Sequence, residues 1–478
     1  MKGYIDSMLI NGKWMDGSSH GRVAVENPST GGVITEIGYG TAEDAWMAVE
    51  AAASAFPAWS HTTARQRADV LFKVSRLLRK RAKHIGFILS QETGKRLVEA
   101  IAEVNFASEY FRWFAEEIRR PEGEWLAQED AEKRLWVRRF PAGVALCLTP
   151  WNFPVSIQAR KLAAALAAGC TVVARPSQMA PLSVIELFRC LQMAGFPNGV
   201  VNLVHGPAGE LTEVLMAHPS VRVVSFTGST SVGRSLLGQS ATRMQRVTLE
   251  LGGNAPFIVF DDSNIDLAVE SAIIAKFRNN GQSCIAANRF FVHRRVYDEF
   301  IHRLQERVRR MRIGNPMEHT TDLGPMIDYA AKEELLHRIE SAVRRGAERL
   351  MPTLTTPEIG YFISPEFLAN VPMDVEFATC ELFGPAAPIW SFDEDDEVLE
   401  RANQGGMGLA AYVFTQSQRR VFYMTEGLEY GIVGVNHGLP SVAIAPMGGR
   451  RMSGFGREGG HIGLEEFQEI QYVSLALM

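Results

Sequence analysis

Residues 144–177 read VALCLTPWNFPVSIQARKLAAALAAGCTVVARPS, and this stretch decides the fold. Two short apolar runs, VALCL and TVVAR, flank a segment that opens with Pro154 and is rich in alanine and leucine. Proline is tolerated in the first turn of a helix, and a strand, a helix and another strand in succession form the unit from which parallel sheets are built. The stretch therefore predicts a doubly wound α/β protein.

The same alternation continues toward the C-terminus. The apolar runs at 200–204 and 221–226 are each followed by a segment with helical spacing, which extends the first predicted sheet. A second alternating stretch begins with PFIVF at 256–260 and continues through RFFVH at 289–293 and a helix after Tyr297. This rhythm predicts two α/β domains in series.

The segments outside this rhythm predict helices and a β extension. Thr41 is followed three residues on by Asp44 and then by helical apolar spacing, the signature of a capped helix. A longer helical region is expected from about residue 65 to residue 119. EDAEKRLWVRRF at 129–140 and FQEIQYVSLAL at 467–477 are β-prone and fit neither domain, so we expect them to pair as a separate extension.

The composition excludes several function classes. The 478 residues are 46% hydrophobic and 22% charged with a net charge of -5, which is ordinary for a globular protein and gives no general attraction to nucleic acid. The first residues lack the apolar core and cleavage site of a secretory signal, and no run of about 18 apolar residues predicts a membrane span, so we expect a cytosolic (cytoplasmic) location. The cysteines show no CxxC spacing, which predicts neither a disulfide framework nor a metal site. They are Cys147, Cys170, Cys190, Cys284 and Cys380.

Two residues are candidates for covalent and acid–base chemistry. Cys284 lies in NNGQSCIAANR, a loop of small and polar residues after a predicted helix, where a thiol could face a cleft. Glu250 ends the apolar run in VTLELGGN, just before two glycines, and a partly desolvated glutamate has the raised pKa that suits a general base. Each also has a plain structural interpretation: a buried inert cysteine, and a strand-end carboxylate with a local hydrogen bond.

Two strand-to-helix turns are candidates for binding. In TPWNFP, the amide of Asn152 stands where it can donate a hydrogen bond to an oxyanion; taken alone, it is an asparagine in a turn. In FTGSTSVG, Gly228 and Gly233 allow close approach, and the helix N-terminus offers N–H groups to a phosphate. The full GxGxxG pattern is absent, and a structural glycine turn explains this stretch equally well.

In their order and separation these motifs resemble the aldehyde dehydrogenase superfamily. The resemblance extends from LINGKW at 9–14 to the C-terminal strand-like run and includes PWNFP, LAAGCTVVARPS, FTGSTSVG, LELGGNAPFIVF, GQSC, ELFGP and MSGFGREGG. It implies an aldehyde dehydrogenase-like fold with two Rossmann-like α/β domains and a β-strand oligomerisation extension. The implied dinucleotide-binding domain comprises 1–120 and 142–253, the catalytic domain 254–446, and the extension 121–141 and 457–478.

The resemblance also implies an activity, the NAD(P)-dependent oxidation of an aldehyde to a carboxylic acid through a thioester. Cys284 would be the nucleophile, Glu250 the base, and Asn152 with the backbone N–H of Cys284 the oxyanion hole. Relatives that transfer the acyl group to coenzyme A lack this glutamate, so Glu250 favours hydrolysis to the free acid.

The implied cofactor is NAD or NADP. The family's adenosine-ribose pair is usually a lysine and a glutamate three residues apart, whereas Arg175 and Gln178 stand here. The glutamate's repulsion is missing and arginine is a bidentate phosphate donor, so we expect NADP to be at least tolerated; otherwise Arg175 replaces lysine against the hydroxyls and NAD remains usable. The implied cofactor-binding residues are Trp151, Arg175, Ser177, Gln178, Gly209, Gly228, Ser229, Gly233, Glu381 and Phe383.

Within the superfamily the chain is most similar to succinate semialdehyde dehydrogenases. The similar stretches are WNFPVSIQARK, KFRNNGQSC and EYGIVGVNHGLPS. The resemblance implies that Arg160, Arg278 and Ser441 hold the carboxylate of a small anionic aldehyde. Either arginine could instead form a salt bridge with a nearby acid.

Several residues depart from that group. Ala286 stands where a second cysteine often permits a regulatory disulfide, so no such redox switch is expected. His437, Arg450 and Arg451 would add positive charge near the substrate loop, and His437 is a further substrate-binding candidate. A sulfonate- or phosphonate-bearing aldehyde, such as sulfolactaldehyde, is therefore the alternative substrate.

Two alternatives of a different class are a catalytically silent binding member of the same fold and a cofactor-free cysteine hydrolase. The joint presence of an amide donor, a base, a thiol and Glu381 argues against the silent member, and cofactor titration would identify the hydrolase. No nucleic-acid or membrane partner is expected. The family suggests a homo-oligomer, a dimer or a homotetramer, built through the β extension.

Overall fold

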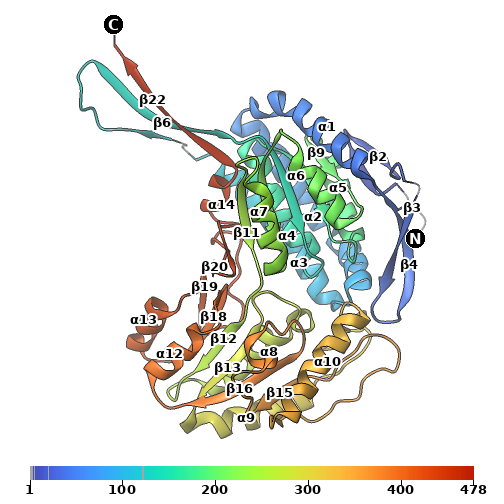
Figure 1. Cartoon of the computed structure of the whole chain (residues 1–478), viewed down its shortest axis with the longest axis vertical. Coiled ribbons are helices and arrows are strands. Elements are labelled where there is room, and N and C mark those ends of the chain that lie inside the picture. The colour runs from blue at the N-terminus through green and yellow to red at the C-terminus, as the bar shows by residue number, and fades with distance from the viewer. Residues whose placement is uncertain (1–3, 5, 20, 121–122, 478) are drawn as a thin grey trace.

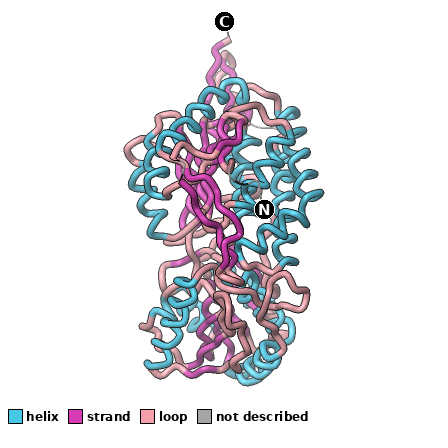
Figure 2. The backbone as a smooth tube through the Cα atoms, turned by 90° about the vertical axis from the view of Figure 1, so that its right-hand side faces the viewer, coloured by secondary structure: helices cyan, strands magenta, loops and turns pink. Residues whose placement is uncertain are grey.

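The computed structural model describes all residues except 1–3, 5, 20, 121–122 and 478. The described chain folds around two mainly parallel sheets, which occupy the upper and lower parts of Figure 1. Helices flank the strands on both sides, as Figure 2 shows, so the predicted α/β fold class is confirmed. Within the described ranges, no helix is long and apolar enough to cross a membrane.

The first sheet grows from the stretch at 144–177. VALCL lies in β7 (Val144–Thr149) and TVVAR in β8 (Thr171–Pro176), and the two strands pair in parallel with α4 (Pro154–Ala168) between them in the chain. Every residue of β7 is buried, as expected for a central strand covered on both faces. The order across the sheet is β2 (Lys13–Met15), β1 (Met8–Ile10), β9 (Val201–Leu203), β8, β7, β10 (Val221–Thr227), β11 (Arg246–Glu250) and β21 (Gly454–Phe455).

The helices around this sheet follow their sequence signals with one exception. At the start of α1, Thr41 and Asp44 form the expected capping box. The region at 65–119, predicted as one helical stretch, is two helices, because Gly94 adopts a left-handed φ of 71° and ends the first. In addition to α4, the helices around the first sheet are α1 (Ala42–Ser60), α2 (Ala64–Thr93), α3 (Leu97–Glu117), α5 (Leu182–Ala194), α6 (Ala208–Ala217) and α7 (Thr230–Ser240).

The second sheet contains the predicted runs PFIVF and RFFVH as parallel neighbours. The helix expected after Tyr297 begins earlier, at Arg294, because the His293 side chain accepts a hydrogen bond from the N–H of Arg295. The strand order is β14 (Glu348–Arg349), β15 (Glu366–Ala369), β16 (Ala386–Phe392), β13 (Ala287–His293), β12 (Ala255–Val259), β18 (Ala410–Phe414) and β19 (Ile432–Val435). Its helices are α8 (Ile265–Phe277), α9 (Arg294–Arg309), α10 (Tyr329–Arg344), α11 (Glu376–Thr379), α12 (Asp395–Asn403) and α13 (Gln418–Gly427).

The two β-prone segments that fit neither domain do pair with each other. β6 (Lys133–Pro141) and β22 (Gln468–Ala476) run antiparallel, with Val137 opposite Tyr472, and β5 (Glu124–Trp125) adds a short third strand. Together they form an arm that projects from the first sheet in Figure 1. The short helix α14 (Ile462–Glu465) precedes β22.

Two small antiparallel pairs complete the described structure. β3 (Gly21–Asn27) and β4 (Gly32–Tyr39) form a hairpin, which the sequence analysis does not predict. β17 (Met407–Gly408) pairs with β20 (Arg450–Arg451). This second pair fixes the chain just before β21, which returns to the edge of the first sheet beside β11.

Candidate active site

Cys284 is positioned by a loop that reaches from the second sheet to the first. After α8 the chain makes a short 3-10 turn, in which Asn279 and Asn280 adopt left-handed φ values of 52° and 58°. The Nδ2 atom of Asn279 donates a hydrogen bond of 2.9 Å to the carbonyl oxygen of Asn152, at the end of β7. The Nδ2 atom of Asn152 donates to the carbonyl of Gln282, at 3.3 Å. These bonds bring the predicted nucleophile and the predicted oxyanion donor into one neighbourhood.

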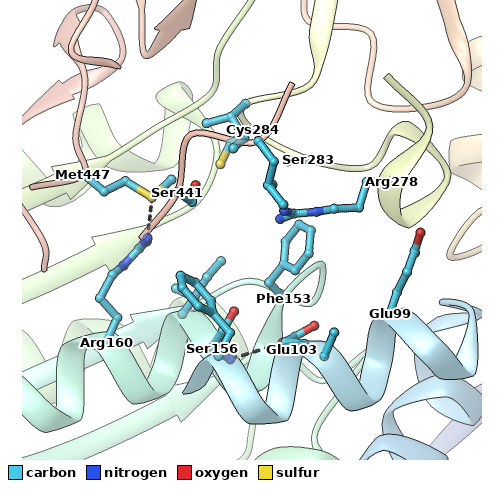
Figure 3. A pocket seen from close by; sticks show the side chains of 15 residues that line it. Glu99, Glu103, Phe153, Ser156, Arg160, Arg278, Ser283, Cys284, Ser441 and Met447 are labelled. Carbon is cyan, nitrogen blue, oxygen red and sulfur yellow. Dashed lines mark hydrogen bonds between the residues drawn. The ribbon is translucent and has the colours of Figure 1, made fainter. Parts of the chain in front are cut away.

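A cavity of about 260 Å³ opens beside Cys284. Its wall combines the loop of the thiol, the start of α4, one face of α3 and the segment after β19 (Figure 3). The lining includes three of the four predicted substrate-binding residues, Arg160, Arg278 and Ser441. The other lining residues are Glu99, Ala102, Glu103, Phe106, Phe153, Ser156, Ile157, Ser283, Cys284, Ile285, Leu439 and Met447.

The surroundings of Cys284 oppose ionisation of its thiol. Burial raises the pKa of Cys284 well above its usual value, and the nearby carboxylate of Glu250 raises it further, whereas Arg160 acts in the opposite direction. Glu250 lies at the end of β11 and is 1% exposed. Its Oε1 atom has no hydrogen-bond partner among the described residues, so this carboxylate oxygen remains able to accept a proton or a hydrogen bond. The predicted base and nucleophile are therefore neighbours.

Arg160 forms salt bridges with two acids, which the sequence analysis gives as the alternative to binding the substrate. Its Nη2 atom lies 3.2 Å from Oε2 of Glu250, and its Nε atom lies 2.5 Å from Oε2 of Glu458. Glu458 also pairs with Lys161, and although burial opposes ionisation, the two cations hold the pKa of Glu458 below its usual value. Arg160 still lines the cavity through its Nη1 side, where Met447 is its neighbour.

Arg278 has a different environment. It lines the same cavity and lies over the ring of Phe153, with 4.7 Å between the guanidinium carbon and the ring centroid. Among the described residues it forms no ion pair within 4 Å, although Glu99 of the same cavity wall is close enough for Arg278 to oppose the rise in pKa that burial gives that carboxyl. Ser441 lies in the same wall (Figure 3).

The remaining expected sources of positive charge do not reach this cavity. His437 is exposed on the loop after β19 and is absent from the lining. Arg450 and Arg451 are exposed in β20, and Arg451 pairs with Glu429 at 2.8 Å. The expectation that these three residues add charge near the substrate is therefore not met, because β20 pairs with β17 and turns its side chains outward.

A second cavity lies at the carboxyl ends of β7, β8 and β10 and extends beside α7. It is lined by Arg175, Ser177, Gln178, Gly209 and Gly228, all predicted to bind cofactor. Ser229 caps α7 by accepting the N–H of Val232. A Cβ atom at Gly233 would lie 2.5 Å from a terminal carbon of the Leu251 side chain, so a larger residue here would require that side chain to shift.

Three other predicted cofactor residues, Glu381, Trp151 and Phe383, lie outside the lining of this second cavity. Glu381 accepts the N–H of Gly253 at 3.0 Å, and burial raises its pKa to about 7. The rings of Trp151 and Phe383 meet edge to face, with centroids 5.6 Å apart. Ala286, where a second cysteine could have stood, is buried beside the loop.

The residues of the second cavity fit a dinucleotide. The Nε atom of Arg175 is buried without a partner among the described residues, and the Oγ1 atom of Thr227 is likewise unpaired. The α7 N-terminus offers N–H groups toward phosphate oxygens. The lining of this cavity contains Arg175 but no aspartate or glutamate, so it does not repel phosphate.

Comparison with known proteins decides the family. The family model described as Aldehyde dehydrogenase family matches residues 14–473. The chain belongs to the aldehyde dehydrogenase family. The recognition made from the motifs is confirmed, and the enzyme is an NAD(P)-dependent oxidoreductase that converts aldehydes to acids.

Similar relatives cover nearly the whole aldehyde dehydrogenase chain. The NADP(+)-dependent succinate-semialdehyde dehydrogenase GabD of Escherichia coli K12 is 41% identical over 98% of this chain and 97% of its own. A 3-sulfolactaldehyde dehydrogenase of Pseudomonas putida is 42% identical over 98% of this chain and 96% of its own. The crystal structure of a succinate-semialdehyde dehydrogenase from Burkholderia pseudomallei superposes with a TM-score of 0.96 at 41% identity, covering 98% of each chain.

Sequence reasoning about this aldehyde dehydrogenase missed several residues that hold the site. Glu458 lies inside the quoted motif MSGFGREGG, but nothing in the motif indicates that it reaches Arg160 across 298 positions. Lys95 is fully buried and pairs with Glu103, and its Nζ atom donates to the carbonyl of Asn152 at 2.8 Å. A charged residue inside an otherwise apolar helix face was the available signal for Glu103.

Proposed function

We propose that this aldehyde dehydrogenase oxidises a short anionic aldehyde, with succinate semialdehyde as the leading substrate. The observation that carries the proposal is the position of Arg278, a cation without an ion-pair partner among the described residues, in the wall of the cavity beside Cys284. A guanidinium suits a carboxylate because it offers a planar pair of donors. The relatives named for succinate semialdehyde support the same substrate class.

The first half of the proposed reaction forms a thioester. Because the pKa of Cys284 is raised, its proton must be transferred as the sulfur attacks, and the carboxylate of Glu250 is the nearby acceptor. Glu250 must pass this proton on to solvent before hydrolysis begins. The attack places negative charge on the aldehyde oxygen, which the amide of Asn152 and the backbone N–H of Cys284 would stabilise. When bound, the nicotinamide cofactor supplies the acceptor for the hydride that leaves this tetrahedral carbon.

The second half releases the acid. A carboxylate such as Glu250, buried and with one oxygen unpaired, can take a proton from water as that water attacks the thioester. We therefore expect Glu250→Gln to retain a burst of NAD(P)H, formed more slowly because the thiol has lost its proton acceptor, and to lose most of its steady-state rate, by about 100-fold or more. Cys284→Ala should produce no burst. An unchanged steady-state rate in Glu250→Gln would remove this residue from the role of base.

The residues around the second cavity support use of NADP as well as NAD. Arg175 has donors available beside the adenosine end, and Gln178 uses its amide to donate to the carbonyl of Gly206. Ser177, Gly209, Gly228, Ser229 and Gly233 would face the phosphates, while Glu381, Phe383 and Trp151 would hold the nicotinamide end. The dinucleotide-binding domain would comprise 1–120 and 142–253, and the catalytic domain 254–446.

Substrate preference tests the proposal directly. We would measure kcat/KM for succinate semialdehyde, glutarate semialdehyde, sulfolactaldehyde, phosphonoacetaldehyde and a neutral aldehyde of similar length. The proposal expects a strong preference for the carboxylates, and Arg278→Ala should reduce kcat/KM for them while sparing the neutral aldehyde. Equal values for charged and neutral aldehydes would overturn the assignment of Arg278 and the anionic substrate class.

A sulfonated aldehyde is the second candidate because of the 3-sulfolactaldehyde dehydrogenase relative. The mechanism and the role of Arg278 would stay the same, since guanidinium groups bind sulfonates and carboxylates alike. A higher kcat/KM for sulfolactaldehyde than for succinate semialdehyde would select this candidate.

We also propose that the arm of β5, β6 and β22 assembles the enzyme into a dimer or tetramer. A three-stranded sheet without a core of its own needs a partner surface, and this arm exposes apolar side chains. They include Trp125, Ile470, Tyr472, Leu475 and Leu477. A cytosolic location stays a prediction of the sequence.

A further inference from the structure

The guanidinium of Arg160 lies near the ring of Tyr110, with 6.0 Å between the guanidinium carbon and the ring centroid, and its three nitrogens have different neighbours. Its Nε atom donates to Oε2 of Glu458 at 2.5 Å, and its Nη2 atom donates to Oε2 of Glu250 at 3.2 Å. Its Nη1 atom faces the thioether of Met447. Arg160 and both acids are almost completely buried. One cation therefore connects the proposed base with a second, deeper carboxylate.

The two acids are held unequally. Glu458 is fixed on both oxygens, because its Oε1 atom also accepts from Lys161 and from the hydroxyl of Ser225. Glu250 has a longer contact with Arg160, and its other oxygen has no partner among the described residues. Glu458 therefore anchors the guanidinium, and Glu250 is the partner that can be exchanged.

Arg160 also faces the space where a substrate would lie. Figure 3 shows Arg160 and Arg278 on opposite sides of the cavity, with Cys284 and Ser441 between them. A thioether is a weak hydrogen-bond acceptor, so the Nη1 atom has little to lose when an anion replaces Met447 as its neighbour. An anionic tail in this cavity would thus meet a cation already engaged with the base.

We propose that Arg160 makes hydrolysis of the thioester depend on the anionic tail of the substrate. In the absence of an anion, Arg160 restrains Glu250. An anion that binds the Nη1 side of Arg160 adds a negative charge next to Glu250 and draws the guanidinium into the cavity, so the contact between Nη2 and Glu250 weakens and the carboxylate is released toward the thioester. Arg160 is on this basis a positioning residue for the base, and Arg278 is the receptor that brings the anion in.

The released carboxylate completes a balanced step. Glu250 takes one proton from water, the water oxygen forms a bond to the thioester carbon, and the C–S bond breaks with its electron pair going to the sulfur of Cys284. The products are the acid, which gives its proton to solvent, and a thiolate that regains a proton from Glu250. No oxidant beyond the cofactor of the first half-reaction is needed.

The inference rests on the proposed function. It is tested by supplying the aldehyde group and the anionic group as two separate small molecules. Holoenzyme with NAD(P) oxidises acetaldehyde, which carries no tail, and sodium acetate is added at constant ionic strength against sodium chloride. The steady-state rate after the NAD(P)H burst reports hydrolysis. We expect acetate to raise this rate saturably by roughly tenfold, because a hydrogen bond to a charged group contributes on that order. An unchanged or lower rate would overturn the inference.

Variants separate the two arginines. Arg160→Lys keeps the charge but cannot bridge both acids, so we expect a rate with acetaldehyde that no longer responds to acetate. Arg278→Gln should raise the acetate concentration needed for half activation while saturating acetate still activates. Activation of Arg160→Lys as strong as that of the unaltered enzyme would overturn the role of Arg160. The experiment on the unaltered enzyme needs no variant to fold.

The outcomes distinguish this inference from the proposed function. If anionic aldehydes are preferred in kcat/KM but acetate does not accelerate hydrolysis, the substrate class stands and the coupling through Arg160 is wrong. If kcat/KM shows no preference for anionic aldehydes, the substrate class itself is wrong.

Discussion

At the residue scale, Cys284 combines high reactivity in the proposed reaction with an environment that keeps it protonated. Burial and the carboxylate of Glu250 both raise its pKa. Cys284 is partly exposed in its cavity, but a thiol with a raised pKa stays protonated until an aldehyde arrives, and this slows its alkylation and oxidation. The thiol proton therefore leaves the sulfur of Cys284 only when the sulfur attacks an aldehyde.

This environment predicts the reactivity of Cys284 without cofactor. Glu250→Gln removes a negative charge that raises the pKa of Cys284, so that pKa should fall. At a fixed pH below the pKa, the thiolate fraction rises and alkylation becomes faster. The measurement is the pH profile of iodoacetamide labelling, whose inflection should move to lower pH in Glu250→Gln.

Background labelling is the main control for that experiment. Cys147, Cys170 and Cys190 are buried, and Cys380 is partly exposed, so labelling of Cys284→Ala gives the contribution of the other thiols. An identical inflection with and without the Glu250 carboxylate would contradict the electrostatic account.

Arg175 predicts a cofactor effect at the same scale. Its unpaired donor and the absence of acidic residues from the lining of that cavity favour the 2′-phosphate of NADP. We expect Arg175→Gln to raise KM for NADP by about tenfold, the equivalent of about 1.4 kcal/mol, and to change KM for NAD much less. Initial rates with each cofactor check this. An equal rise for both cofactors would mean that Arg175 contacts hydroxyls common to the two.

Single residues also mark the limit of prediction from the sequence. Cys284, Glu250 and Asn152 were found because each lies in a local motif, and the structure brings them together. The partners of Arg160 were not identifiable, since Glu458 is 298 positions away and Glu250 is 90 positions away. Which acid meets which arginine depends on the packing of α4 against two distant segments.

At the element scale, the N-terminus of α4 is fixed by a buried ion pair between Glu103 of α3 and Lys95, which lies just before that helix. The Oε1 atom of Glu103 accepts the N–H groups of Val155 and Ser156, each at 3.1 Å, and its other oxygen pairs with Lys95. Lys95 also donates to the carbonyl of Asn152. One pair thus orients both the helix and the turn that carries the predicted oxyanion donor.

Breaking this pair should destabilise the protein and impair the site. Lys95→Met leaves the buried carboxylate of Glu103 without its cation, at a cost of about 3 kcal/mol. We expect a lower urea midpoint and a reduced kcat, because the turn at Asn152 loses a hydrogen bond. Adding Glu103→Gln to this variant should restore part of the stability.

A surface pair on the same helix gives the matched control. Arg112 and Glu116 form an exposed ion pair at 2.9 Å, so Arg112→Gln should leave the midpoint and kcat unchanged. A Lys95→Met protein as stable as Arg112→Gln would show that α4 is positioned by other contacts.

Elements with strong local signals were predictable, and those that depend on context were not. β7, β8 and α4 carry apolar runs and a proline start, and they form where expected. The break after Thr93 was missed because a glycine in a helical pattern signals an end only once its φ is known. The β3–β4 hairpin was missed because its half-exposed strands carry too few apolar residues to stand out.

At the scale of the whole molecule, the site forms where the two sheets exchange segments. β11 ends at Glu250 and leads directly into β12, while the loop of Cys284 returns from α8 to the turn after β7. The chain then comes back to the first sheet as β21, beside Glu250. Base, nucleophile and oxyanion donor are therefore close only when both sheets are folded.

The arm is the part of the molecule that we propose joins copies of the chain. It projects from the first sheet in Figure 1, and Ile470 and Tyr472 lie on the same face of β22 because they are two residues apart. Both are exposed. We expect the double variant Ile470→Asp with Tyr472→Asp to reduce the mass of the assembly, since two charges would be buried in an apolar contact. Size-exclusion chromatography with light scattering measures this mass.

Measuring the mass and the activity of the double variant beside a control variant distinguishes a loss of assembly from a loss of folding or catalysis. Ile359→Asp places the same charge at an exposed apolar residue between β14 and β15 of the second sheet and should leave the mass unchanged. The lining of the cavity at Cys284 contains no residue of β5, β6 or β22, so the smaller species should keep its activity per chain. A double variant with unaltered mass would show that copies of the chain meet elsewhere. Loss of activity together with mass would mean that the arm also stabilises the cavity across the interface, through its anchor at the edge of the first sheet.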